Sequence, residues 1–285
     1  EDIVTPQTYD YAGFTAPEQR TLEITADGNA VLRYDYTRNT YTLTFYATEG
    51  TLEGNETITA LYGADITPPS AYREGYGFAG WYDGDVRFDV RTMPSKDMKL
   101  TAAWKAGEYG YTVNYYHQNV DGSDKYTLVA SLNETAPMDS EVEAPLKGFE
   151  GFTAVGEAKT ITICTDESKN VVDYYYTRNQ YTLSWDFAGG AADNYTSGTL
   201  YYGTKINAPV PVKEGYSYEW SRELFADMPA ENLEYTAIWK ADSYILTLDV
   251  NGGSLPADAA LSKNVVFDEV YGEPVSYTHL TLPTN

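Results

Sequence analysis

The sequence predicts an all-β fold, or an α+β fold dominated by strands, built as a tandem array of small modules. The first observation is an internal repeat, because the segment 34–43 returns almost unchanged at 174–183. Such self-similarity is typical of repeated modules and outweighs a length that would otherwise suggest about two domains. The second observation is the alternation of polar with apolar or aromatic residues, which is the period of half-buried strands. The third is the aromatic content of 15%, with 28 Tyr, because Tyr suits strands with one dry and one wet face.

Charge and hydropathy exclude several classes of partner. The chain has 42 acidic and 19 basic residues, a net charge of −23, so it repels nucleic acid and anionic membranes. Abundant aromatics argue against disorder. We find no apolar run long enough for a membrane span and no signal peptide. We therefore expect no membrane insertion in this segment, and a targeting signal and anchor encoded elsewhere.

The repeat unit at 107–180 is expected to form one complete module. It reads as a strand at 111–116, a turn at 119–124, a return strand at 126–130 and a closing strand at 170–176. Residues 1–39 match its second half, with a strand expected at 30–36. We therefore interpret 1–39 as the C-terminal part of a module of the same type.

A second module type is predicted at 40–106. Strands are expected at 41–45 and 58–63, followed by prolines, an aromatic segment at 74–82 and a closing strand at 100–104. The same order returns at 181–241, with Glu219-Trp220-Ser221 where Gly-Trp-Tyr is expected. The segment before its Met-Pro pair is shorter, so we expect a different local hairpin. A truncated third copy is predicted at 242–274.

These two module types resemble known bacterial families. The run Glu74-Gly75-Tyr76-Gly77-Phe78-Ala79-Gly80-Trp81-Tyr82 resembles the internalin-type B-repeat, also called the Listeria-Bacteroides repeat. The other type, with its Asp-Gly turn and final Tyr-rich strand, is similar to the mucin-binding MucBP-like repeat. The resemblance implies small β-grasp-like modules arranged as an elongated array on a bacterial surface. The residues that carry the B-repeat pattern are Gly75, Tyr76, Phe78, Gly80, Trp81, Trp104, Gly215, Tyr216, Trp220 and Trp239.

The repeated Tyr-Thr-Arg-Asn segment is predicted to be a rigid joint between modules. A strand of one module ends before it and a strand of the next begins after it, which leaves connectors at 37–40 and 177–180. A short connector without Gly or Pro has few conformations. We expect both copies to hold similar geometries. The joint residues are Thr37, Arg38, Asn39, Thr177, Arg178 and Asn179.

The sequence offers no constellation for catalysis or metal binding. His117 is interpreted as a solvated hairpin residue rather than a general base, and no Ser-His-Asp pattern accompanies it. Residues 119–124 have the oxygen-rich spacing of a calcium loop but lack the bidentate Glu, so an Asp-Gly turn explains them. Cys164 follows an apolar alternation and is interpreted as a buried strand residue rather than a reactive thiol. We predict a protein without enzymatic activity, cofactor or metal.

Candidate ligand-binding residues are Tyr115, Tyr116, Tyr174, Tyr175 and Tyr176. Adjacent strand residues face opposite sides, so one set packs the core while the other is wet. The wet set either makes cross-strand pairs or forms a platform for glycans. The MucBP-like resemblance implies mucin glycans or host surface proteins as partners.

Two functions follow from these expectations. The first is a non-enzymatic, monomeric stalk or spacer in a bacterial cell-surface or adhesin-like protein. The alternative is a module that binds host glycan or protein directly. The last residues, 275–285, resemble a translated sequencing adapter, and we exclude them from the fold prediction as an artefact.

Overall fold

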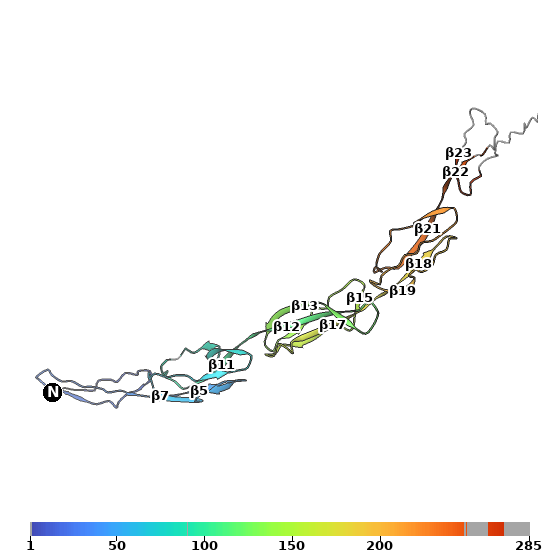
Figure 1. The fold of residues 1–285 in the computed structure, drawn as a ribbon. Helices are drawn as coiled ribbons and strands as arrows, with labels where there is room; N and C mark the ends of the chain where they lie inside the picture. Colours follow the sequence, from blue (N-terminus) through green and yellow to red (C-terminus); the bar gives the residue numbers. More distant parts are fainter. Residues whose placement is uncertain (1, 90, 248, 250–261, 271–285) are drawn as a thin grey trace, which may run out of the picture. The chain divides into compact units, whose positions relative to one another are not determined.

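The computed structural model describes residues 2–89, 91–247, 249 and 262–270, and every regular element in this part of the chain is a strand (Figure 1). The fold is therefore all-β, and the α+β alternative is not adopted there. The predicted artefact at 275–285 and much of the third B-type segment lie outside the described residues. Contacts divide the chain into two compact units. One comprises Glu1–Val113, Leu132–Pro145 and Ala158–Val172, and the other Asn114–Ser131, Leu146–Glu157 and Asp173–Asn285.

The first B-type module forms a five-stranded sheet in the order β10-β9-β11-β5-β7. Its first and last strands, β5 and β11, are parallel neighbours, and Leu43 lies opposite Met98. Side chains on one face of these strands form the core, where Leu43 and Leu100 are fully buried and Trp81 is 5% exposed. A separate pair, β6 with β8, flanks this sheet. The strands are β5 (Thr40–Tyr46), β6 (Thr51–Glu53), β7 (Thr57–Leu61), β8 (Ser70–Tyr72), β9 (Tyr76–Asp83), β10 (Val86–Arg87) and β11 (Met98–Ala106).

The second B-type module repeats this topology with the sheet order β19-β18-β21-β20. Again the first and last strands are parallel, with Leu183 opposite Leu233. No counterpart of β10 forms among its described residues, and β20 lacks the bulge that β9 shows against Ala103 and Trp104. The shorter segment noted in the sequence therefore does produce a different local structure. The strands are β18 (Gln180–Asp186), β19 (Gly198–Tyr201), β20 (Tyr216–Trp220) and β21 (Leu233–Ala241).

The segment 107–180 forms a sheet in the order β13-β12-β17-β15 together with a β14-β16 pair. Alternate residues of β12 and β17 are buried, as the period of two requires. Strands β12, β13 and β17 each begin in one compact unit and end in the other. The strands are β12 (Glu108–Gln118), β13 (Tyr126–Pro137), β14 (Glu141–Glu143), β15 (Phe152–Ala154), β16 (Thr160–Thr162) and β17 (Val171–Arg178).

The N-terminal segment corrects one expectation. Residues 30–36 were expected to form a strand, but only β4 (Thr37–Arg38) forms there, paired with β2 (Phe14–Thr15). The equivalent strand β17 is flanked by β12 and β15, whereas no strand among the described residues 2–39 takes the place of β12. A strand without a ladder partner cannot satisfy its backbone groups by pairing. The remaining pair consists of β1 (Asp2–Val4) and β3 (Leu22–Ile24).

The described residues after the second B-type module form one pair of antiparallel strands. Strand β22 (Ser243–Thr247) pairs with β23 (Ser262–Val266), and Ser243 lies opposite Val266. The first B-type module opens in the same register, with Thr40 opposite Leu61. The described start of the third copy therefore has the strand pairing of a B-type module.

Candidate functional site: the joints between modules

The connector between modules is shorter than the sequence suggested. The segments 37–40 and 177–180 were expected to be four-residue connectors, but the flanking strands leave only Asn39 between β4 and β5, and Asn179 between β17 and β18. The reason is that the backbone N–H and the carbonyl of each of these two asparagines both make hydrogen bonds. The Asn39 N–H donates to the Gly13 carbonyl at 2.9 Å, and its carbonyl accepts from the Tyr62 N–H at 2.8 Å. Asn179 makes the same bonds with Gly151 and Tyr202, both at 2.9 Å.

Within the described residues this arrangement occurs four times. In each joint the carbonyl of a glycine, the turn glycine, accepts a hydrogen bond from the backbone N–H of a second residue, the bridging residue. The carbonyl of the bridging residue in turn accepts a hydrogen bond from the N–H of a third residue, the covering residue. All of these bonds are 2.8–2.9 Å long. All the members of each joint lie inside one compact unit. In the order turn glycine, bridging residue and covering residue, the joints are Gly13, Asn39 and Tyr62 (first); Gly75, Gly107 and Met138 (second); Gly151, Asn179 and Tyr202 (third); and Gly215, Asp242 and Phe267 (fourth).

The turn glycine is required by its backbone conformation. The four φ values lie between +74° and +84°, a region that costs other residues about 1–2 kcal/mol. In each case the following N–H closes a four-residue turn, as Phe152 does on the Phe149 carbonyl at 3.1 Å. Positive φ at the third position of such a turn is the mark of type II. Glu-Gly-Tyr and its Gly-Phe equivalent therefore encode the turn that starts a joint.

The covering residue lies in a second turn of the same kind. The residue after it has positive φ in all four joints, namely Gly63, Asp139, Gly203 and Asp268. The covering side chain lies directly over the turn glycine. A Cβ added to Gly151 would lie 2.3 Å from the Tyr202 ring, and one on Gly75 would lie 2.7 Å from Cγ of Met138. Neither site has room for a side chain.

Aromatic contacts reinforce three of these joints. The ring that follows the turn glycine meets the covering ring edge to face. Phe14 and Tyr62 are 5.6 Å apart at 79°, and Phe152 and Tyr202 are 5.6 Å apart at 77°. Tyr216 meets Phe267 at 5.5 Å and 78°. Such pairs contribute about 0.5–1.5 kcal/mol beyond the area they bury.

The predicted joint residues have parallel roles in the first and third joints. Asn39 accepts from the Thr15 hydroxyl, and Asn179 accepts from that of Thr153 at 2.6 Å. Arg38 donates to the Tyr62 carbonyl at 3.2 Å, and Arg178 donates to that of Tyr202 at 2.7 Å. Thr37 and Thr177 pair with Thr15 and Thr153 in the flanking ladders. The two joints therefore share these contacts, and the similar geometry of the modules on either side stays a prediction.

The third joint has extra contacts from β12. Arg178 Nε donates to the Gln118 carbonyl at 2.7 Å, and its N–H donates to the Gln118 side-chain oxygen at 3.0 Å. His117 stacks on Phe152 with ring centroids 3.9 Å apart. No hydrogen bond among the described residues reaches its buried Nε2. Burial, with a smaller effect of Arg178, lowers the pKa of His117.

His117 is therefore not a solvated hairpin residue, as the sequence suggested, but a packed residue of β12. The sequence places it two positions before the turn, and only the tertiary structure brings Phe149 and Phe152 against it. A neutral, half-buried imidazole stabilises the joint by packing.

The second and fourth joints use a Tyr-Asp contact instead. The Tyr76 hydroxyl donates to Asp139 at 2.7 Å, and that of Tyr216 donates to Asp268 at 3.3 Å. The hydrogen bond to Asp139 raises the pKa of Tyr76. The Arg73 guanidinium lies 3.7 Å from the Tyr76 ring centroid and pairs with Glu49 at 2.6 Å. The B-repeat pattern residues Gly75, Tyr76, Gly215 and Tyr216 thus belong to joints, which sequence reasoning missed.

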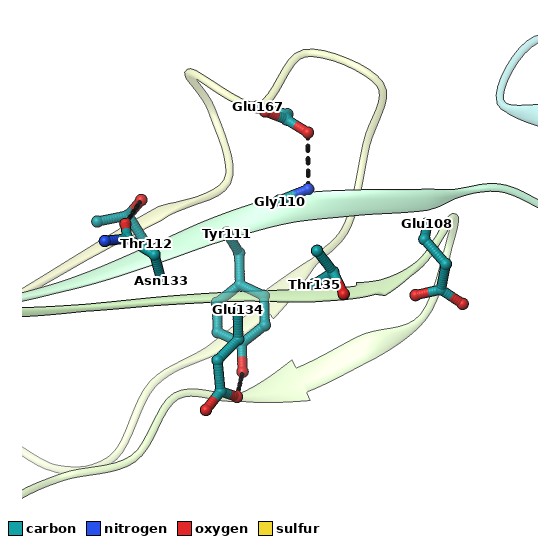
Figure 2. A pocket seen from close by; sticks show the side chains of 8 residues that line it. All are labelled: Glu108, Gly110, Tyr111, Thr112, Asn133, Glu134, Thr135 and Glu167. Carbon is teal, nitrogen blue, oxygen red and sulfur yellow. Dashed lines mark hydrogen bonds between the residues drawn. The ribbon is translucent and has the colours of Figure 1, made fainter.

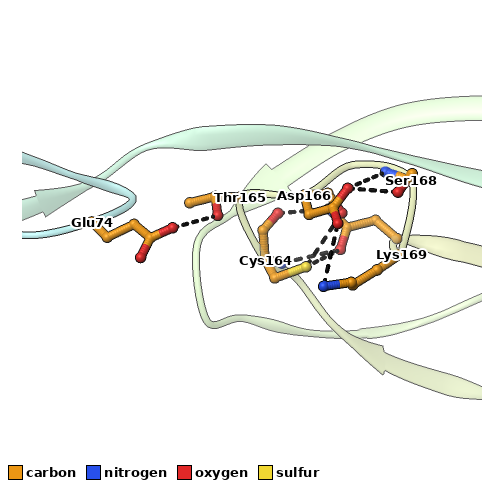
Figure 3. A network of polar contacts seen from close by, with 7 residues as sticks. Glu74, Cys164, Thr165, Asp166, Ser168 and Lys169 are labelled. Atoms are coloured by element: carbon orange, nitrogen blue, oxygen red, sulfur yellow. Dashed lines mark hydrogen bonds and ion pairs between the residues drawn. The ribbon is translucent and has the colours of Figure 1, made fainter.

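A loop of the 107–180 module completes the second joint. Thr165 donates to Glu74, next to the turn glycine, at 3.0 Å (Figure 3). Cys164 lies in the same loop, where its N–H donates to Asn170 at 3.1 Å. The expectation of a buried strand residue is wrong for Cys164, because strand pairing stops at Thr162 and Ile163 takes the buried position.

A shallow cleft of about 410 Å³ lies beside the start of β12 (Figure 2). Two of its three carboxylates are already engaged, since Glu167 accepts from the Gly110 N–H at 2.7 Å and Glu134 from the Tyr111 hydroxyl at 2.8 Å. Among the described residues, no three acidic, His or Cys side chains come together as a metal site. The predicted turn at 119–124 is confirmed, because the Gly122 N–H donates to the Asn119 carbonyl at 3.1 Å.

The candidate tyrosines divide between two faces of the sheet. Tyr115, Tyr174 and Tyr176 are at most 1% exposed, so a ligand cannot reach them without unfolding. Tyr116 and Tyr175 lie on the opposite face and stack at 5.0 Å with an interplanar angle of 17°. Tyr126 meets Tyr175 edge to face at 5.2 Å. Only the second set is accessible.

The tryptophans of the B-repeat pattern lie in or beside the cores. Trp104 donates from its indole to the Thr48 carbonyl at 2.9 Å, and Trp239 donates to that of Phe187 at 2.8 Å. Trp220 packs against Trp185 with centroids 4.8 Å apart. Phe78 is 40% exposed, so it lies on the surface beside Trp81.

Residues 41–103 match the family model of the Listeria-Bacteroides repeat domain. This match supports the B-repeat interpretation of that part of the chain. In the part of the chain that the structure describes, no helix is long and apolar enough to cross a membrane.

Two curated relatives come from Evansella cellulosilytica. One, named "Putative Gly-rich membrane protein", is 27% identical over 221 residues, which cover 64% of this chain and 24% of the relative. Another, named "Putative membrane protein", is 27% identical over 239 residues, which cover 75% of this chain and 34% of the relative. The chain thus spans about a quarter to a third of the length of these relatives. A solved structure of the Bacillus anthracis TIE protein aligns over 84% of this chain and 58% of its own, at 9% identity and a TM-score of 0.30, too low to support an argument.

Proposed function

We propose that this chain is a non-enzymatic stalk or spacer in a bacterial cell-surface protein, with modules that alternate between MucBP-like and B-repeat types. The observation that carries the proposal is the joint. Adjacent modules are connected by a single bridging residue, whose N–H and carbonyl are both hydrogen-bonded, and a side chain covers the turn glycine. These contacts leave the connection between the modules few conformations. A spacer needs this property, because a flexible linker would not hold a distal part of the protein at a defined distance.

Further observations support the same proposal. The parallel first and last strands of the two B-type modules fit the β-grasp-like fold that the B-repeat resemblance implies. The names of the relatives describe membrane proteins, which fits an envelope or extracellular location. A strongly acidic surface also favours solubility of an extended chain.

Small-angle scattering of the full chain tests the stalk proposal. We expect an elongated particle whose maximum dimension is far above the roughly 45–50 Å expected for a globule of this length, taking the radius of gyration as about 2.2·N^0.38 Å. The triple variant that replaces three of the four turn glycines, Gly13, Gly75 and Gly151, by Val should broaden the distribution of distances. A compact profile for the unaltered chain, or an identical profile for the variant, would contradict the proposal.

The accessible tyrosines support a second candidate function, the binding of a host glycan. Tyr116 and Tyr175 present a stacked pair beside Asn114, which donates to Asp173 at 2.9 Å. Rings flanked by polar groups suit sugars. Screening the full chain against a mucin and glycan array, with the Y116A/Y175A variant as control, separates the functions. No signal above an equally acidic control protein would remove this candidate.

A further inference from the structure

The first B-type module has a second cleft, of about 380 Å³, on the side of β9 and β10. Three aromatic side chains, Phe78, Trp81 and Phe88, and two cations, Arg87 and Arg91, line it. Among the aromatic side chains, Trp81 is almost fully buried, while Phe78 is 40% exposed. The volume lies in the range of small-molecule sites, about 300–1,000 Å³.

The local fold builds this cleft from features that the first B-type module has and the second lacks. The β9-β10 hairpin places Arg87 opposite Tyr82, and the Phe88 N–H donates to the Trp81 carbonyl at 2.8 Å. Gly80 has φ +130°, and a Cβ there would lie 3.1 Å from Nε of Arg87. The missing side chain therefore leaves the space in which the guanidinium lies.

The two arginines have few partners. Arg87 Nε lies 3.7 Å from Asp89, and both side chains are exposed, at 59% and 87%. Such an exposed pair contributes little and can open for a ligand. Among the described residues, no ion pair or side-chain hydrogen bond engages Arg91. Because Asp89 also lines the cleft, its lining has two positive charges and one negative charge, in a chain of net charge −23.

We propose that this cleft binds an acidic saccharide. The ring of a sugar would lie against Phe78 and Phe88, and its carboxylate would accept hydrogen bonds from Arg87 and Arg91. A guanidinium is suited to this because its planar fork donates two parallel hydrogen bonds to a carboxylate. The aromatic wall adds apolar contact that a free carboxylate or an acidic peptide would not use.

The second B-type module provides an internal comparison. When the two modules are aligned so that Trp239 matches Trp104, Glu219 takes the place of Gly80. Among its described residues, the second module also has no equivalent of β10. Its Arg222 is held by Glu231 at 2.7 Å. We therefore expect the first B-type module to bind the sugar and the second not to. This inference is independent of the stalk role.

Calorimetric titration of the full chain tests the proposal, at about 20 mM salt so that screening is weak. The probes are a galacturonic acid disaccharide, the corresponding neutral galactose disaccharide and a tetraglutamate peptide. We expect a single site for the acidic sugar, with both other probes weaker by about tenfold or more. R87Q and R91Q should each weaken binding by about tenfold, equal to about 1.4 kcal/mol. D89N should tighten binding, because it removes the competing carboxylate.

Two controls make the outcome decisive. R222Q in the second B-type module should leave the affinity unchanged, and near-ultraviolet dichroism should show that the variants are folded. Equal binding of the neutral sugar would overturn the role of the arginines, and equal binding of tetraglutamate would overturn the saccharide assignment. Absence of binding by the unaltered chain, or an R222Q effect as large as that of R87Q, would overturn the site itself.

Discussion

At the scale of single residues, glycine and the residue that covers it determine whether a joint can form. Gly151 has positive φ, and the Tyr202 ring lies over it, so a side chain there meets two obstacles. Gly156 also has positive φ, at +93°, but no neighbouring atom would lie within 4 Å of an added Cβ. The two positions therefore separate backbone strain from the loss of the covering contact.

We expect Gly151→Ala to open the third joint far more than Gly156→Ala does. The Gly156→Ala change should cost about 1–2 kcal/mol of local backbone strain. Gly151→Ala adds displacement of Tyr202, so protection of the Asn179 amide against hydrogen exchange should fall about tenfold further. Equal losses of protection in the two variants would show that the ring contact contributes nothing.

His117 makes the third joint sensitive to pH. Its pKa is lowered from the ordinary 6.5 by burial and by Arg178, so the folded joint favours the neutral imidazole. The contribution of His117 to stability is therefore complete above about pH 6.5 and is lost as the pH falls through this value toward the folded pKa.

Hydrogen exchange between about pH 7.5 and 5.5, corrected for the intrinsic rate, measures this effect. Protection of the Asn179 amide should fall with pH, while that of the equivalent Asn39 amide, with no neighbouring histidine among the described residues, should not. The variant H117Q should remove the difference. A pH-dependent difference that persists in H117Q would assign it to carboxylates instead.

At the scale of elements, strand β12 distinguishes the third joint from the first. In both joints an arginine donates to the carbonyl of the covering residue, but only Arg178 also donates to Gln118. The arginine of the third joint therefore connects β17, β12 and the next module, while Arg38 connects two segments.

We expect Arg178→Gln to cost more than Arg38→Gln. Each hydrogen bond lost costs about 0.5–1.5 kcal/mol, more where the donor is charged. The amide of Tyr202 should therefore lose more protection in R178Q than the amide of Tyr62 loses in R38Q. The same loss in both variants would show that the hydrogen bond from the Arg178 side chain to the Gln118 carbonyl does not stabilise the joint.

At the scale of the whole molecule, the four joints share one set of backbone hydrogen bonds although three kinds of side chain cover the glycine. The position over the turn glycine is taken by a tyrosine in two joints, Tyr62 and Tyr202, by Met138 in the second joint and by Phe267 in the fourth. A joint that depends on the backbone and on one large side chain should accept modules in a different order.

Deletion of residues 108–179 tests this interchange. It brings Gly107 directly before β18, and Tyr202 should then replace Met138 over Gly75. We expect the Gly107 and Tyr202 amides to stay protected against exchange, and the same deletion with Gly75→Val to lose that protection. Rapid exchange in the deletion chain itself would mean that each joint is specific to its own pair of modules.

The sequence by itself predicted most of the strands and the repetition of the Tyr-Thr-Arg-Asn segment at two joints. These are local properties, because alternation follows from the backbone geometry of a strand and a repeat is read from the residues themselves. The tertiary structure decided which residues meet at a joint. Tyr62 covers Gly13 and Met138 covers Gly75 only after whole strands have paired, and no local pattern reports such distant contacts. The tertiary structure also decided which tyrosines are exposed to solvent, and it placed His117 against Phe152. Burial depends on the side chains of the neighbouring strands, which are distant in the sequence.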